Sequence, residues 1–83
     1  MAKVFFTPNS SRYFQKLKDK KLKIRLLDAK KILEINPYSG KKLKGDLFGQ
    51  YTLRIWPYRI IYFVDKNKNV IITDIGHRKD VYR

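Results

Sequence analysis

Residues 51–83 read YTLRIWPYRIIYFVDKNKNVIITDIGHRKDVYR, and this stretch decides the fold. Before Trp56-Pro57, Leu53 and Ile55 alternate with Thr52 and Arg54, which is the pattern of a strand with two different faces. A further strand from Tyr58 to Val64 places Ile60, Tyr62 and Val64 on one face and Arg59, Ile61 and Phe63 on the other. Asp65 to Asn69 is a polar turn, and the apolar run from Val70 to Ile75 predicts a further strand. The C-terminal part of the chain is therefore expected to form a β-meander.

Two arginines flank the Trp-Pro turn of this meander. If the hairpin loop has an even number of residues, Arg54 and Arg59 lie on the same face of the sheet. Like charges beside each other on a strand pair destabilise it. A small protein that tolerates this cost is expected to hold the two charges for an anionic ligand.

The N-terminal segment predicts a strand followed by a helix. Lys3 to Thr7 is short and apolar and is bounded by a proline. Asn9 or Ser10 is expected to cap the next helix, because short polar side chains can accept from its free N–H groups. Tyr13, Phe14 and Leu17 recur at helical spacing and give this helix its buried stripe.

A second helix is expected from Asp19 to the Asn-Pro at 36–37, since the residue before a proline leaves the helical region. Its buried face is predicted to comprise Leu22, Leu26, Ala29 and Leu33. The order is then β-α-α-β-β-β in one α+β domain over residues 1–83. The helix pair covers one face of a mainly antiparallel sheet, and the other face carries the arginines.

The composition points to a polyanionic partner. A net charge of +13 attracts nucleic acid first, an acidic protein second and an anionic membrane surface last. A basic surface that only confers solubility is the alternative. The chain has no cysteine, no apolar run near the roughly 20 residues that span a bilayer, and no apolar core of a signal peptide near its N-terminus. A cytoplasmic protein without disulfides or thiolate metal sites is expected.

Most catalytic constellations are missing from the sequence. It has one histidine, no Cys-His dyad, no metal-ligand spacing, no P-loop and no glycine-rich dinucleotide fingerprint, so no metal or cofactor is expected. The remaining candidates are Arg54, Arg59, Arg78, Tyr82 and His77. Such a set can cleave RNA, because the 2′-hydroxyl is an internal nucleophile and arginine grips phosphate oxygens. The same set can also bind RNA without cutting it.

A lysine-rich loop and an isolated histidine add candidates for RNA binding. Residues 39–45 read SGKKLKG, and the loop presents Lys41, Lys42 and Lys44. His77 follows a glycine and is either an RNA contact or a turn residue. Trp56 and Phe63 could stack on bases or pack against a partner chain. Each charged or phenolic candidate also has a purely structural alternative. The arginines and lysines could be solvated positions of a strand or loop, and Tyr82 could only fix the tail onto the sheet.

Two motifs carry a resemblance to a known family. The pattern Tyr-x-Leu-Arg-Ile-x-x-Tyr-Arg-Ile-Ile-Tyr at 51–62 and Ile-Gly-His-Arg-Lys-Asp-Val-Tyr at 75–82 resembles the RelE/ParE superfamily of toxins, most closely the RelE branch. The Asn-Pro at 36–37 and the Lys-Leu-Lys-Gly at 42–45 also match. The resemblance covers the whole chain and implies the same β-α-α-β-β-β fold.

The resemblance implies a toxin that enters the ribosomal A site and cuts messenger RNA through attack by the 2′-hydroxyl. It also implies an acidic antitoxin of the RelB type as the partner. By position, Arg59 and Arg78 correspond to the arginines at the phosphate, Arg54 to a basic residue that assists proton transfer, and Tyr82 to a tyrosine that orients the base. Thr52 stands where the best-known members have a lysine, which leaves the proton acceptor open.

Two rival functions are also compatible with the sequence. One keeps the fold but inhibits DNA gyrase, as ParE-like proteins do, and the other is an RNA-binding module without catalysis. The cluster of Arg54, Arg59, Arg78 and Tyr82 favours phosphate chemistry. The sequence given ends at Arg83, without the longer C-terminal helix of some relatives, so the regulatory role of that helix is not assumed here.

Overall fold

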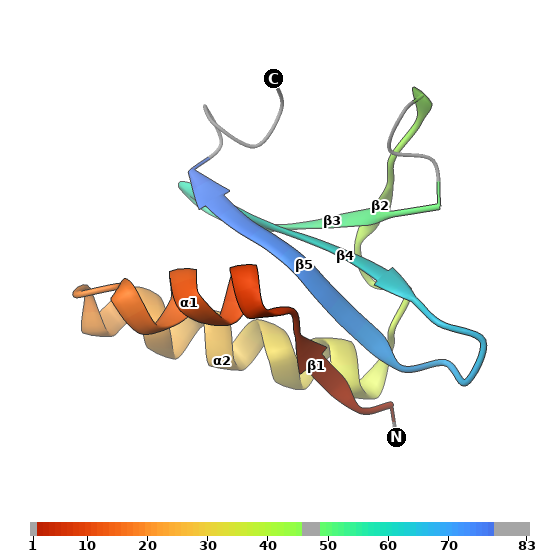
Figure 1. Cartoon of the computed structure of the whole chain (residues 1–83), viewed down its shortest axis with the longest axis horizontal. Helices are drawn as coiled ribbons and strands as arrows, with labels where there is room; N and C mark the ends of the chain where they lie inside the picture. Colours follow the sequence, from red (N-terminus) through yellow and green to blue (C-terminus); the bar gives the residue numbers. More distant parts are fainter. Residues whose placement is uncertain (1, 46–48, 78–83) are drawn as a thin grey trace.

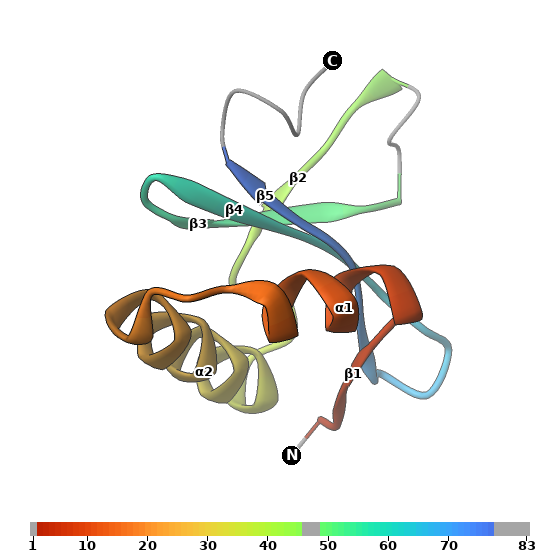
Figure 2. The same cartoon turned by 60° about the vertical axis from the view of Figure 1, so that its left-hand side comes forward.

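The computed structural model describes residues 2–45 and 49–77, which form two helices and a five-stranded sheet (Figure 1). In chain order the elements are β1 (Val4–Phe6), α1 (Pro8–Lys16), α2 (Lys20–Ile35), β2 (Lys41–Lys42), β3 (Tyr51–Ile55), β4 (Tyr58–Val64) and β5 (Val70–His77). The strand order is β1-β5-β4-β3-β2, with β1 parallel to β5 and the other neighbours antiparallel. Both helices lie on one side of the sheet (Figure 2), so the predicted α+β arrangement is confirmed.

The sheet has one strand more than the sequence predicted. Residues Lys41–Lys42 pair with Thr52 and Tyr51 and form the edge strand β2 inside the expected 39–45 loop. A two-residue strand has too little periodicity to be read from sequence, because only its pairing with β3 defines it. At the other end of the chain, β5 continues to His77, two residues beyond the predicted Ile75.

The cap of α1 differs from the prediction. Thr7, and not Asn9 or Ser10, is the N-cap, and its hydroxyl oxygen accepts a hydrogen bond from the Ser10 N–H at 3.3 Å. Pro8 occupies the first helical position, where its missing N–H and fixed φ cost nothing. Ser10 is instead fully buried, and its hydroxyl donates to the carbonyl of Ile72 at 2.7 Å.

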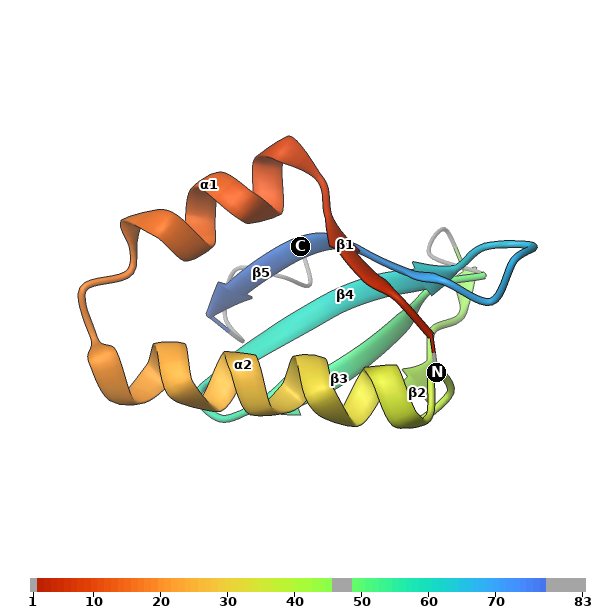
Figure 3. The same cartoon turned by 90° about the horizontal axis from the view of Figure 1, so that it is seen from below.

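Helix α2 follows the sequence prediction closely. Asp19 is its N-cap and accepts from the Leu22 N–H, and the helix ends at the C-cap Asn36. The predicted face is the buried face: its residues are Leu22, Leu26, Ala29 and Leu33. The helix packs on β1 and β3, while α1 packs on β1 and β5. Figure 3, seen from below, shows the two helices set apart on this side, with strands of the sheet visible between them.

The core lies between the helices and the inner face of the sheet. Ile60, Ile72 and Ile75 are buried there together with Tyr62, whose ring stacks on Tyr51 with centroids 5.3 Å apart. Burial raises the pKa of Tyr62 above the ordinary tyrosine value. The hydrogen bond that the Gly40 N–H donates to the Tyr62 oxygen lowers this pKa, and the nearby Tyr51 raises it further. Tyr62 is therefore neutral at physiological pH and acts as a packing and hydrogen-bonding group.

A β-bulge interrupts β5 at Thr73. Ile61 pairs with Asp74 and Tyr62 pairs with Ile72, so Thr73 has no partner residue on β4. The extra residue reverses the alternation of side chains along the rest of the strand. As a result Ile75 joins Ile72 in the core, although regular alternation would place residues three apart on opposite faces.

Gly40 is required where β2 begins. A Cβ atom at this position would lie 2.6 Å from both the carbonyl oxygen of Thr52 and the hydroxyl oxygen of Tyr62. We expect Gly40→Ala to lower the free energy of unfolding by about 1–3 kcal/mol, as overpacking commonly does. Urea unfolding followed by circular dichroism measures this. Lys44→Ala, at an exposed position of the same segment, is the control, and equal stability of the two variants would contradict the close approach.

Candidate functional site

The β3–β4 hairpin places two arginines directly opposite each other. Ile55 pairs with Tyr58, so the loop consists of Trp56 and Pro57, which are joined by a cis peptide bond. Arg54 then pairs with Arg59 on the side of the sheet away from the helices. The condition set by the sequence, an even loop, is met, and the predicted arginine pair is confirmed as a feature of one face.

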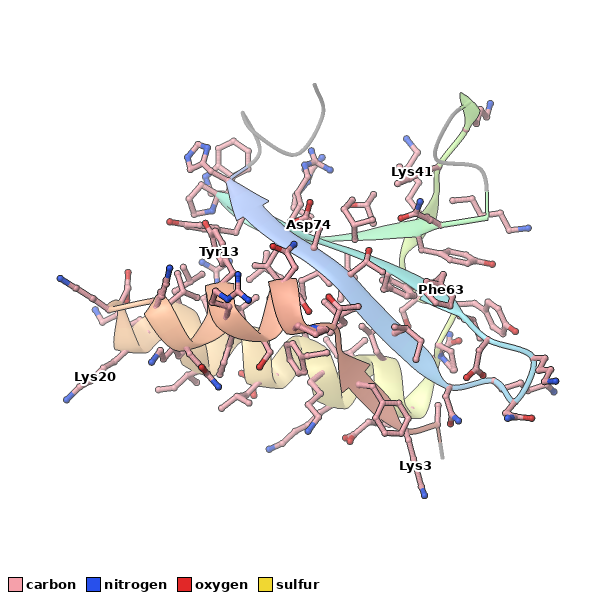
Figure 4. The ribbon with its side chains drawn as sticks, viewed as in Figure 1. Lys3, Tyr13, Lys20, Lys41, Phe63 and Asp74 are labelled. Carbon is pink, nitrogen blue, oxygen red and sulfur yellow. The ribbon has the colours of Figure 1, made fainter. Side chains whose placement is uncertain are left out.

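We call the sheet surface away from the helices the arginine face. The register gives its central part as two rows across the sheet: Lys41, Thr52, Ile61 and Asp74 in one, and Arg54, Arg59 and Gly76 in the other. Figure 4 shows the labelled Asp74 and Lys41 on this side, whereas Tyr13 lies between α1 and the sheet. Lys41 is thus the member of the lysine-rich segment that shares a face with the arginines.

The middle of the arginine face is more closed than the sequence suggested. Thr52 and Ile61 are only 5% and 4% exposed, and Phe63 is half-buried. Trp56 is 50% exposed but belongs to the hairpin loop and not to β3. Ile61 is thus buried on this face, whereas Trp56 and Phe63, the two residues expected to stack on bases or pack against a partner, keep exposed surface.

Thr52 places a buried hydroxyl in this covered region. Within residues 2–45 and 49–77, its Oγ1 has no hydrogen-bond partner. Buried polar atoms usually find a partner, so such an atom marks either a strained packing position or a ligand contact. Among the residues described, Thr52 is the hydroxyl that stands directly beside the Arg54–Arg59 pair, in the adjacent row of the same face.

The other predicted RNA-binding residues are divided between surfaces. His77 pairs with Tyr58, and its ring contacts the Tyr58 ring at a centroid distance of 5.6 Å on the helix side of the sheet. Lys42 pairs with Tyr51, which also faces the helix side, and Lys44 is exposed beyond β2. The structure therefore does not bring His77, Lys42 and the arginine pair together on one face. Arg78 and Tyr82 lie outside the described residues.

Sequence reasoning missed Asp74 as a member of the arginine face. It is exposed, and it lies on β5 two residues before Gly76, which pairs with Arg59. The sequence alone hides the signal, because Val70, Ile71 and Ile72 are all apolar. Only the buried positions of this strand change from even numbers, at Val70 and Ile72, to an odd number at Ile75. A change of parity within a strand indicates a bulge, and a bulge re-aims the side chains that follow it.

A second cationic feature lies on α1. A shallow pocket of about 240 Å³ is lined by Asn9, Arg12, Tyr13 and Lys16. Its polar lining suits a phosphate group of a polyanion and not an apolar ligand. Along residues 2–45 and 49–77, His, Asp and Glu side chains nowhere gather in a group of three or more that could hold a metal ion. Over the same residues, neither helix has the length and apolar character needed to cross a membrane.

Comparison with known proteins agrees with the RelE/ParE resemblance. The family model described as the ParE toxin of the type II toxin–antitoxin system parDE matches residues 4–82. Toxin RelG of Mycobacterium tuberculosis is 38% identical over 45 residues, which are 53% of this chain and 52% of that protein. The match therefore spans about half the length of this relative.

Solved structures with the same fold include toxins. The toxin–antitoxin complex RelBE2 from Mycobacterium tuberculosis matches with a TM-score of 0.82 and 28% identity, over 93% of this chain and 98% of that chain. The YoeB dimer from Staphylococcus aureus has a TM-score of 0.74 and 27% identity, over 93% and 97% of the two chains. The isolated E. coli RelE toxin has a TM-score of 0.78 and 21% identity, over 99% of this chain and 92% of that chain. At this identity the match supports the fold and nothing further.

The opposed arginines predict a repulsive coupling. We test this with a double-mutant cycle of Arg54→Gln and Arg59→Gln. Once one charge is removed, removing the other should raise the free energy of unfolding by less than it does in the wild-type chain. The coupling should be about 0.2–1 kcal/mol and unfavourable, since like charges directly opposite in a sheet repel. Urea unfolding at low and high salt measures it, and the coupling should shrink as salt screens it. A favourable coupling that salt does not change would mean that the pair does not repel.

Proposed function

The chain belongs to the ParE toxin family of type II toxin–antitoxin systems, and we propose that it acts within that class as a ribosome-dependent endoribonuclease. In this proposal it cuts messenger RNA in the ribosomal A site, in the cytoplasm, and so inhibits translation. The observation that carries the proposal is the pairing of Arg54 with Arg59 on the face that the helices leave uncovered. Two guanidinium groups held against their mutual repulsion are suited to a phosphodiester.

The proposed reaction uses the RNA as its own nucleophile. The 2′-hydroxyl attacks the adjacent phosphorus, the bond to the 5′-oxygen breaks, and a cyclic phosphate remains. Arg54 and Arg59 would bind the phosphate oxygens and stabilise the charge that develops on them, and such electrostatic stabilisation commonly accounts for most of the rate enhancement. Arg78 and Tyr82 are proposed as further site residues, one on the phosphate and the other on the substrate base.

The ribosome would supply the geometry of the reaction. Uncatalysed in-line attack is slow mainly because the 2′-oxygen seldom lines up with the scissile bond, and holding that alignment removes much of the barrier. Exposed cationic side chains of the protein would contact ribosomal RNA. They include Lys44 and the two cations, Arg12 and Lys16, that line the pocket on α1. The arginine face would remain directed at the message. Free RNA should then be bound in a salt-dependent manner and cut poorly.

This proposal predicts a difference between naked and ribosome-bound RNA. One transcript should be cut at codon positions on 70S-type ribosomes with an empty A site, and cut far more slowly when free. Arg59→Ala should reduce the ribosome-bound rate by about 100-fold or more, the effect of losing one charge-stabilising donor. Primer extension measures the cuts. Lys66→Ala, in the exposed β4–β5 turn, is the matched charge control.

The outcomes separate this function from its rivals. Equal cleavage of free and ribosome-bound RNA would show that the protein supplies all of the chemistry. An intact message together with stalled replication would favour inhibition of DNA gyrase, the ParE-like alternative. Salt-sensitive RNA binding without any cleavage would leave the non-catalytic binding module. Circular dichroism of Arg59→Ala serves as the control for folding: if the spectrum is unchanged, a loss of cleavage reflects the loss of the Arg59 side chain from the site.

We further propose an acidic antitoxin of the RelB type as the partner of this chain. The net charge of +13 favours it, and so does a second surface that the sequence analysis did not single out. Four aliphatic side chains on the outer face of α2 are exposed: Ile24 by 60%, Leu27 by 45%, Ile32 by 48% and Ile35 by 74%. They lie opposite the buried leucines, and exposed lysines at 20, 21 and 31 share their face. An apolar surface mixed with cations fits a partner helix of aliphatic and acidic residues.

The partner prediction is tested by co-purification with the product of the neighbouring reading frame. We expect the double variant Leu27→Ser, Ile35→Ser to lower the affinity for that acidic protein by about 10-fold or more, since interface anchors of this kind commonly contribute over 1 kcal/mol. Both positions are exposed, so the fold should survive. Gln15→Ser on α1 is the control, and titration calorimetry gives the affinities. Unchanged affinity in the α2 variant would exclude this face.

A further inference from the structure

We propose that Asp74 is the general base of the cleavage reaction and accepts the proton of the 2′-hydroxyl. The inference rests on the proposed endoribonuclease function and supplies the proton acceptor that Thr52 leaves open. Three observations carry it: the bulge that turns Asp74 onto the arginine face, the contacts that hold the bulge in place, and the position of Asp74 beside Arg59.

The bulge determines which way Asp74 points. With regular alternation after Ile72, the side chain of Asp74 would enter the core and that of Ile75 would face outwards. The extra residue Thr73 reverses both, so that Asp74 is exposed opposite Ile61 while Ile75 is buried opposite Ile60. Bulges occur frequently beside active sites, where they re-aim a side chain.

The start of α1 holds this bulge. Both carbonyls at the bulge accept hydrogen bonds from this segment. The Thr7 N–H donates to the Ile72 carbonyl at 3.0 Å, and the Thr7 hydroxyl donates to the Thr73 carbonyl at 3.3 Å. The Ser10 hydroxyl donates to the Ile72 carbonyl at 2.7 Å, and the Asn9 amide donates to the Thr73 carbonyl at 3.4 Å. On the other side of the strand, the Thr73 hydroxyl donates to the Ile61 carbonyl at 3.3 Å. The bulge is therefore a satisfied, defined feature of the fold.

The register also places Asp74 next to the proposed phosphate site. Arg59 pairs with Gly76, so Asp74 is its diagonal neighbour on the same face, at a spacing of about 7–8 Å that a long side chain bridges. Gly76 has no side chain to stand between them. Of the carboxylates in the part of the chain that the structure describes, Asp74 is the one on the arginine face: Asp19 caps α2, Asp28 and Glu34 lie on α2, and Asp65 holds the β4–β5 turn.

The proton balance is simple. As the 2′-oxygen forms its bond to phosphorus, its proton passes to the Asp74 carboxylate. The 5′-oxygen leaves with the bonding electron pair and takes a proton from water, and Asp74 then releases its proton to solvent. Arg54 and Arg59 neutralise the phosphate throughout, so that an anionic base is tolerated beside it.

The test compares Asp74→Asn with the wild-type chain in single-turnover cleavage on ribosomes. We expect the variant to cut about 100-fold more slowly or worse, the usual contribution of a general base. Its affinity for RNA should be unchanged or higher, because the substitution removes a negative charge. The wild-type rate should vary little between about pH 6 and 8.5, whereas the variant rate should rise roughly tenfold per pH unit as hydroxide replaces the base. Asp28→Asn on α2 is the charge-matched control.

Each result has a defined meaning. Wild-type cleavage with an equally active Asp74→Asn variant overturns the role of Asp74 and leaves the proposed function intact. Slow cleavage with a wild-type pH profile, or with RNA affinity reduced in parallel, makes Asp74 a structural residue and also overturns the inference. Partial recovery in Asp74→Glu, with the flat profile restored, supports a carboxylate base. If the wild-type chain cuts no RNA on ribosomes, the proposed function and this inference both fail.

Discussion

The reversal of side-chain alternation at Thr73 is the constraint on which the rest of this molecule depends. Strand β5 is central in the sheet, with β1 on one side and β4 on the other. Its first half must bury Val70 and Ile72 and its second half must bury Ile75, and only an extra residue satisfies both. Without the bulge a carboxylate would enter the apolar core, at a cost of several kcal/mol. The same residue thus completes the core and exposes Asp74 on the opposite face.

The two faces of the sheet meet different energetic demands. On the helix side, aliphatic side chains from α2 and from the strands β1, β3, β4 and β5 fill the core and favour folding by about 25 cal/mol per Å² of apolar area buried. On the other side, Arg54 opposes Arg59, and the buried Thr52 hydroxyl lacks a hydrogen-bond partner among the described residues. Both features oppose stability in a domain that has little to spare. Unfavourable local arrangements that persist in a small fold are typical of functional sites.

Local patterns predicted the parts of the fold that local physics determines. The buried face of α2, its cap at Asp19 and the two-residue hairpin loop follow from periodicity and turn chemistry within a short window of sequence. The strand β2, the fully buried Ser10 and the orientation of His77 depend on pairing with residues far along the chain, so periodicity gave no access to them. Thr7 rather than Ser10 caps α1 because Ser10 is needed at Ile72, which is 62 positions away in sequence. The parity change that exposes Asp74 is hidden in the sequence by the apolar Ile71 and appears only in the pattern of burial along β5.

The arrangement of surfaces constrains how one partner could inhibit this chain. The outer face of α2 and the arginine face lie on opposite sides of the sheet (Figure 2), so a single chain that covers both must pass around a sheet edge. The edge strands β1 and β2 have only three and two residues, which leaves little backbone for strand addition. A flexible acidic segment suits such a path, because it can wrap a large surface and order itself only on binding. Anchoring by α2 would then raise the local concentration of acidic residues at Arg54 and Arg59, and inhibition would require no tight contact at the site itself.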